Sequence, residues 1–160
     1  MDRPAARTAA DRSAAAPAPR LSYLIGRVSQ GVRSALQQRL RAYGLTVPEY
    51  TALSVLQTRP GLSNAQLARR SLITPQSMNQ VVAALERRDL IARAPDPRHR
   101  RILRTTLTPA ADRLLDELAG VVDTFERELL ADLSASEGEQ LVAALRSCMR
   151  RLAAGIDAGA

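Results

Sequence analysis

Residues 63–90 read SNAQLARRSLITPQSMNQVVAALERRDL, and the architecture of the chain can be inferred outward from them. It predicts a short helix, a tight turn and a longer helix. Ser63 is a good N-cap for the short helix, and Gln66 follows three places later, the spacing of a capping box. Thr74 is a good N-cap for the longer helix, with Pro75 at its first position, where the missing N–H costs nothing.

The longer helix has two distinct faces at helical spacing. Its apolar face carries Met78, Val81, Val82 and Leu85. The opposite face is rich in amides and carries no acid; it consists of Gln76, Asn79, Gln80, Ala83 and Arg87. Asn and Gln can bond two edge atoms of adenine, and a helix-turn-helix presents the start of its second helix in the major groove. The alternative is an ordinary solvated helix face.

Composition bounds the class of protein. The 160 residues favour one domain, and a hydrophobic fraction of 46% argues against overall disorder. No apolar run approaches the ~20 residues that a membrane helix needs. The net charge is +7, and the sequence contains arginine but no lysine. The guanidinium group of arginine suits contacts with phosphates and base edges.

The chain offers little for catalysis or for metal binding. Cys148 is the single cysteine, so no intramolecular disulfide can form, which fits a cytoplasmic protein. The single histidine, His99, has no catalytic partner in the sequence, and no phosphate loop, nucleophile motif or metal cluster is present. We therefore expect no enzyme, no cofactor and no metal.

Helices and a hairpin surround the central stretch. Residues 1–20 predict a disordered tail, and residues 21–43 a long helix that Gly44 ends. Thr46 and Glu49 have capping-box spacing at the start of another helix. After Leu90, residues 91–94 and 102–107 predict two short strands.

The turn between these strands is cationic. It spans residues 95–101 and holds Arg98, Arg100 and Arg101, with Arg93 just before it. A hairpin directly after a helix-turn-helix is the layout of a winged helix, and a cationic tip is attracted to the minor groove. The alternative is a solvated hairpin loop.

Two long helices close the chain, one beginning near Thr108 and one at Ser134, where Glu137 has capping-box spacing. Together with the first helix they carry more apolar surface than a small winged helix can cover. This predicts a partner chain, and closed two-fold dimers are the commonest oligomers. A helical subdomain folded back within one chain is the alternative.

Five ordered motifs resemble the MarR family of bacterial transcriptional regulators over residues 21 to the last helix. They are PGLS with QLA at residues 60–68, TPQSM at 74–78, LERRDLI at 85–91, DPRHRR at 96–101 and LT at 107–108. The resemblance implies a domain over residues 21–160. Residues 21–45 and 109–157 would form dimerisation helices, and residues 46–108 a winged-helix lobe that binds DNA.

The resemblance further implies an obligate homodimer that represses genes on a palindromic operator and is released by a small ligand or an oxidant. Residues 74–80 would lie in the major groove and the wing arginines would reach the minor groove. The resulting candidate DNA-binding residues are Ser63, Thr74, Gln76, Ser77, Asn79, Gln80, Arg98, Arg100 and Arg101.

This sequence departs from the family pattern at three places. An aspartate often stands where His99 stands and braces the last wing arginine, so Asp96 is the acid available to brace Arg101. Asp89 replaces a glycine that often follows the recognition helix, and aspartate tolerates a left-handed backbone. The peroxide-sensing cysteine near the first helix is absent, and Cys148 lies on an apolar stripe, which favours packing over a redox role.

The leading hypothesis is a dimeric repressor that responds to a ligand and binds double-stranded DNA. A helical dimer that binds protein without reading DNA is the alternative. Tyr23, Tyr43 and Tyr50 could line a pocket for a phenolic or other aromatic effector, or could simply pack in the core or an interface.

Overall fold

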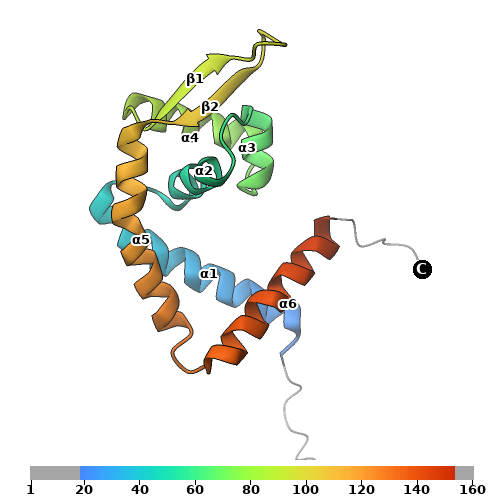
Figure 1. Ribbon diagram of the computed structural model, residues 1–160. Helices are drawn as coiled ribbons and strands as arrows, with labels where there is room; N and C mark the ends of the chain where they lie inside the picture. Colours follow the sequence, from blue (N-terminus) through green and yellow to red (C-terminus); the bar gives the residue numbers. More distant parts are fainter. Residues whose placement is uncertain (1–18, 154–160) are drawn as a thin grey trace, which may run out of the picture. The chain divides into compact units, whose positions relative to one another are not determined.

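The computed structural model describes residues 19–153, so almost all of the expected tail lies outside the described residues. In chain order the elements are α1 (Leu21–Leu40), the 3-10 turn η1 (Arg41–Tyr43), α2 (Val47–Thr58), α3 (Asn64–Arg70), α4 (Pro75–Arg87), β1 (Ile91–Pro95), β2 (Leu103–Leu107), α5 (Pro109–Leu129) and α6 (Ala135–Ala153) (Figure 1). The chain divides into two compact units after Ala35. The expected class, mainly helical with a hairpin wing, is confirmed.

Reciprocal caps start the helices as the sequence predicts. Thr46 accepts a hydrogen bond from the Glu49 N–H at 3.3 Å, and the Glu49 carboxylate accepts one from the Thr46 N–H at 2.7 Å. Ser134 and Glu137 repeat this pair before α6. Each box satisfies backbone donors that the first helical turn leaves unpaired, which is worth about 1 kcal/mol of helix stability.

Three helical segments end in one backbone motif, with a left-handed residue after the helix. These residues are Gly44 (φ 65°), Leu72 (φ 56°) and Asp89 (φ 55°). In each case the next N–H bonds to the carbonyl five residues earlier, in the pairs Leu45 to Leu40, Ile73 to Ala68 and Leu90 to Leu85. Gly44 therefore ends the first helical segment as predicted, and Asp89 adopts the expected left-handed backbone.

One core holds the second unit together. It draws fully buried side chains from every helix between the end of α1 and α5, among them Leu40, Leu53, Leu67, Met78, Leu85 and Leu118. Arg39 also links the end of α1 to α5, because its guanidinium stacks 4.8 Å from the Phe125 ring centre and pairs with Glu128. The core fixes the base of α4 and of the hairpin.

The hairpin is antiparallel and follows α4 directly. Its register pairs Ile91 with Leu107 and Pro95 with Leu103. The start of β1 and the end of β2 are as predicted, whereas β1 ends one residue later and β2 begins one residue later than the sequence indicates. A further bridge between Leu62 and Thr105 joins β2 to the segment before α3. The hairpin is thereby anchored at its base, and its turn projects from the lobe in Figure 1.

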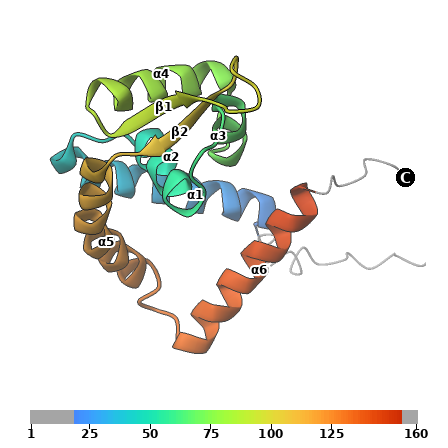
Figure 2. The same ribbon diagram turned by 45° about the horizontal axis from the view of Figure 1, so that its top comes forward.

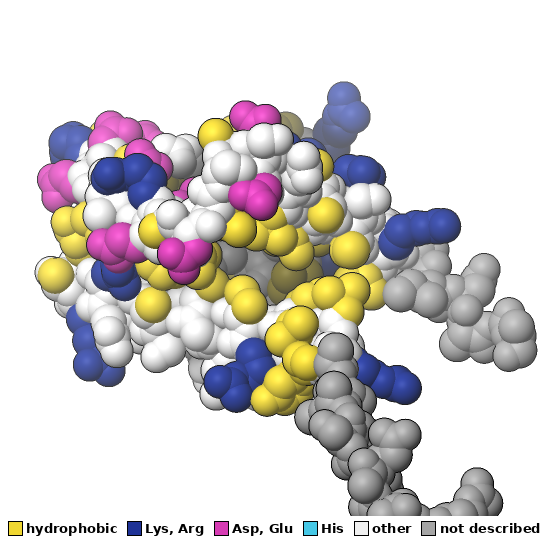
Figure 3. Space-filling model, turned by 90° about the horizontal axis from the view of Figure 1, so that it is seen from below, with side chains coloured by type: hydrophobic (Ala, Val, Ile, Leu, Met, Phe, Trp, Pro, Cys, Tyr) yellow, Lys and Arg dark blue, Asp and Glu magenta, His cyan; other side chains and the backbone are white. Residues whose placement is uncertain are grey.

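Apolar side chains remain exposed on α6. They are Leu141, Val142, Leu145, Met149 and Leu152, with exposed fractions of 41–65%. Cys148 is exposed as well, so the packing expected for it does not occur within the single chain. Figure 3, a view from below, shows hydrophobic side chains exposed at the surface. Among the described residues, no helix has the length and apolar character needed to cross a membrane.

Candidate nucleic-acid interface

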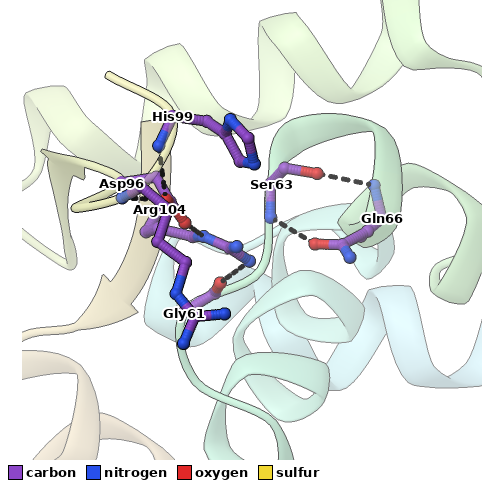
Figure 4. A network of polar contacts seen from close by, with 7 residues as sticks. Gly61, Ser63, Gln66, Asp96, His99 and Arg104 are labelled. Carbon is purple, nitrogen blue, oxygen red and sulfur yellow. Dashed lines mark hydrogen bonds and ion pairs between the residues drawn. The ribbon is translucent and has the colours of Figure 1, made fainter. Parts of the chain in front are cut away.

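The helix-turn-helix begins at a capping box. The Ser63 N–H donates to Gln66 Oε1 at 2.9 Å, and the Gln66 N–H donates to Ser63 Oγ at 3.4 Å (Figure 4). The box starts α3, which buries Leu67 and Ala68. The Ser63 hydroxyl is therefore committed to the cap as an acceptor, which leaves its proton as the group that could reach DNA.

The N-terminus of α4 is capped by Thr74, as predicted. Thr74 Oγ1 accepts from the Ser77 N–H at 3.1 Å and donates to Ser77 Oγ at 2.9 Å. Both hydroxyls therefore pair with each other, while both side chains remain exposed. The free N–H groups and partial positive charge of a helix start favour an anion such as a phosphate.

The two faces of α4 separate as the sequence predicts. Met78, Val82 and Leu85 are buried, and Val81 is half-buried. The amide-bearing positions Gln76, Asn79 and Gln80 are exposed, together with Ala83 and Arg87. In Figures 1 and 2, α4 lies beside β1, with which it is in contact. The lobe thus presents an acid-free polar stripe on the helix that contacts its hairpin.

Asn64, which is not among the predicted DNA-binding residues, forms a side-chain link between α3 and α4. Asn64 Nδ2 donates to Asn79 Oδ1 at 2.9 Å and lies 3.4 Å from the Pro75 carbonyl oxygen. Helical spacing within one element gives no signal for such a contact, because its partners lie on different helices. Asn79, one of the candidate base readers, therefore already has its oxygen engaged.

Asp96 organises the turn of the hairpin. Its Oδ1 accepts from the N–H groups of Arg98 and His99 at 2.7 and 2.8 Å, and its Oδ2 accepts from Arg104 Nε at 2.5 Å. Arg104 Nη1 in turn donates to the Gly61 carbonyl at 3.0 Å (Figure 4). The hairpin turn is thereby tied through Arg104 to the segment that precedes α3.

Asp96 does not brace Arg101, in contrast to the expectation. Its two oxygens are occupied by the Arg98 and His99 backbone and by Arg104, and no hydrogen bond joins it to Arg101 within residues 19–153. Asp96 is 5% exposed. The hydrogen bond from Arg104, followed by those from the two N–H groups, holds the pKa of its carboxyl below the ordinary value of 3.8.

The wing arginines keep the exposure that phosphate or groove contacts require. Arg98, Arg100 and Arg101 are all exposed, and none has an ion-pair partner in the described part of the chain. Arg93 differs, because its guanidinium lies 3.6 Å from the Glu86 carboxylate of α4. The cationic surface of the wing therefore consists of three arginines rather than four.

Arg88 fixes the far end of α4. Its two terminal nitrogens donate to the Gly44 and Tyr43 carbonyls at 2.7 and 3.0 Å. These carbonyls belong to the end of the first helical segment, where C-terminal partial negative charge favours a cation. Spacing along one helix does not indicate this contact, because its partners lie 44 and 45 positions before Arg88 in the chain.

Comparisons with known proteins agree with this architecture. A MarR family model matches residues 43–102. The HTH-type transcriptional repressor Rv2887 of Mycobacterium tuberculosis is 38% identical over 117 residues, which is 73% of this chain and 84% of the repressor.

Crystal structures of Rv2887 superpose on the chain. The complex with salicylic acid has 34% identity and a TM-score of 0.69, covering 83% of this chain and 98% of the other. The complex with DNA has 33% identity and a TM-score of 0.68, covering 81% and 98%. The family comprises regulators rather than enzymes. With its winged helix-turn-helix and a relative this similar, the chain belongs to the MarR family of transcriptional regulators.

Proposed function

We propose that the chain acts as a homodimeric repressor that binds a palindromic operator. The observation that carries this proposal is the exposed amide stripe of α4, formed by Gln76, Asn79 and Gln80, beside a hairpin tipped by arginines. In this arrangement α4 enters the major groove, with Thr74 and Ser77 at its leading end. Arg98, Arg100 and Arg101 reach the adjacent minor groove or its phosphates.

The exposed apolar stripe of α6 supports the homodimer. Leu141, Leu145 and Met149 are 41%, 44% and 63% exposed in the single chain. Stable monomers rarely leave such a continuous apolar stripe in water, and a two-fold axis would cover it with its own copy. Two α4 helices related by that axis would meet successive major grooves ~34 Å apart.

DNA readout favours this function over a helical dimer that binds only protein. A protein-interaction module would have no need for an acid-free amide stripe or for three unpaired wing arginines on one lobe. Because those arginines would displace counterions from phosphates, affinity should fall steeply as salt rises. We also propose a cytoplasmic location, because the operator would lie on chromosomal DNA.

We further propose that an aromatic acid acts as the effector. Rv2887 has been crystallised with salicylic acid. In this chain, Tyr43 and Tyr50 are half-buried against the core, whereas Tyr23 is 56% exposed on α1. An effector releases the operator only if it binds the DNA-free conformation more tightly than the DNA-bound one.

Binding to genomic fragments tests the proposal. Fragments from the source genome are selected with the full chain at moderate salt, and a gel shift then compares one selected fragment with unrelated DNA. We expect a two-fold symmetric motif and competition by the unlabelled motif alone. Equal competition by unrelated DNA would refute sequence-specific binding. Salicylate added to the same assay should release the motif, and unchanged binding at saturating salicylate would refute an effector of this kind.

A further inference from the structure

Asn64 stands between the start of α3 and the outer stripe of α4. It is the first residue of α3, and its Nδ2 contacts both the Pro75 carbonyl oxygen and Asn79 Oδ1, at 3.4 and 2.9 Å. Asn79 is exposed, and its Nδ2 has no hydrogen-bond partner among residues 19–153. The contact therefore constrains a side chain that faces solvent on the proposed reading surface.

The Pro75 carbonyl fixes which way both amides are turned. A backbone carbonyl oxygen only accepts hydrogen bonds, so the Asn64 atom that faces it is the nitrogen. The same nitrogen faces Asn79, so Asn79 must present its oxygen there. Reversing Asn64 would place two carbonyl oxygens 3.4 Å apart. Asn64 Oδ1 is now buried without a hydrogen-bond partner. Reversing the amide would bury its NH₂ group there instead, and two unpaired donors cost more free energy than one unpaired acceptor.

We propose that Asn64 is a positioning residue that sets the base preference of Asn79. This inference rests on the proposed function, because it requires α4 to lie in the major groove. By holding Asn79 Oδ1, Asn64 turns the Asn79 amide nitrogen outward as a donor. Asn79 then reads an acceptor on a base edge with its nitrogen. Because its oxygen is turned toward Asn64, it does not make the two-atom contact with which asparagine bonds adenine.

The chemistry of the groove gives this orientation a signature. Guanine presents two acceptors, N7 and O6, and thymine presents O4, whereas cytosine presents only a donor at N4. Adenine offers one acceptor at N7 beside its N6 donor. An outward nitrogen therefore favours guanine or thymine at the contacted position, and an outward oxygen favours adenine or cytosine.

Replacing Asn64 with an acid of the same shape tests the inference. In Asn64→Asp the new carboxylate has only acceptors, so it cannot donate to Asn79 Oδ1. It either turns away from the Pro75 carbonyl and releases Asn79, or accepts from the Asn79 nitrogen and so turns the Asn79 oxygen toward the groove. A carboxylate at a helix start is also compatible with folding. Operator selection with the wild type and with Asn79→Ala first identifies the position that Asn79 reads. At that position, the ratio of affinities for guanine or thymine to adenine or cytosine should fall about tenfold or more in Asn64→Asp.

Two controls separate specificity from charge and from folding. Gln66→Glu adds the same charge on α3 and keeps a capping residue at its position, so it should lower affinity on every sequence while leaving the ratio unchanged. Asn64→Ala removes the restraint without adding charge and should weaken the guanine or thymine preference. Thermal melting of each variant checks that the fold persists, and if Asn64→Asp does not fold, Asn64→Ala carries the test.

The outcomes distinguish this inference from the proposed function. If the wild type shows no sequence preference, both are overturned. If the wild type is selective, three results overturn the positioning role alone. The first is that the ratio of affinities for guanine or thymine to adenine or cytosine stays within about twofold of the wild type in both Asn64→Asp and Asn64→Ala. The second is that the wild type prefers adenine at the position that Asn79 reads. The third is that Asn79→Ala leaves the base preference unchanged.

Discussion

Met78→Ala should destabilise the fold without altering base preference. Met78 is fully buried on the inner face of α4, against the core that the helix-turn-helix shares with α2. Truncating a buried methionine removes its transfer free energy and leaves a cavity, which together cost about 2–5 kcal/mol. For a chain of this length, that loss lowers Tm by roughly 4–20 °C.

Gln80→Ala is the matched control from the opposite face of the same helix. Gln80 is exposed, so its removal should change the free energy of unfolding by no more than about 0.5 kcal/mol. Its loss should nevertheless relax base preference at one operator position. Urea unfolding at one fixed subunit concentration measures stability, because a dimer's apparent stability depends on concentration. An operator panel measures preference.

The crossed result is the informative one. Met78→Ala should lose stability and keep the wild-type ranking of operator variants, measured at a temperature where the variant is folded. Gln80→Ala should keep stability and lose part of the ranking. If Gln80→Ala proved as destabilising as Met78→Ala, or if Met78→Ala changed the ranking and Gln80→Ala did not, the assignment of the two faces of α4 would be wrong.

Three other changes give separate predictions. Leu72→Gly should raise the free energy of unfolding by about 1 kcal/mol, and Gly44→Ala should lower it by about as much. The reason is that both positions have positive φ, which only glycine adopts freely. Chemical unfolding measures both changes, and a change in the same direction for the two variants would contradict the reasoning. Asp96→Asn should weaken DNA binding on all sequences alike, because an amide cannot accept from Arg104 and from both N–H groups of the turn at once. A gel-shift panel compares this variant with Asp123→Asn, the same charge change at an exposed position of α5. Equal DNA affinities of the two variants would refute the prediction. Because the pKa of Asp96 is lowered, its contribution to the stability of the wing is complete above pH 3.8 and disappears as pH falls through the lowered value. The difference in wing amide exchange between the wild type and Asp96→Asn should therefore stay constant from about pH 5 to 8.

Sequence reasoning succeeded where structure depends on neighbours along the chain. The reciprocal caps at Thr46 and Ser63, the left-handed stop at Gly44 and the buried stripe of α4 all follow from spacings within one or two turns. Each of these features is specified by local backbone geometry, which a single sequence displays directly.

The same reasoning did not reach contacts between elements. Asn64 with Asn79, and Arg104 with Asp96 and Gly61, join residues from different elements through side-chain reach. The sequence places Arg93 beside the wing cations, but its guanidinium pairs with Glu86 where the hairpin contacts α4. Exposure of Cys148 likewise depends on how α6 is covered, which no spacing along the helix determines.

An affinity panel over every base change in the selected operator, repeated at several salt concentrations, separates base reading by α4 from phosphate contacts by the wing. Gln76→Ala should lose about 1–3 kcal/mol of discrimination at a single position in each half-site, with Gln140→Ala of α6 as its matched control. Arg100→Ala should weaken all sequences by the same factor and reduce the salt dependence by about one counterion per subunit, with Arg113→Ala as its control. If Gln76→Ala and Arg100→Ala both lowered the affinity for every operator variant by the same factor, α4 would not read bases while the wing contacts the DNA phosphates.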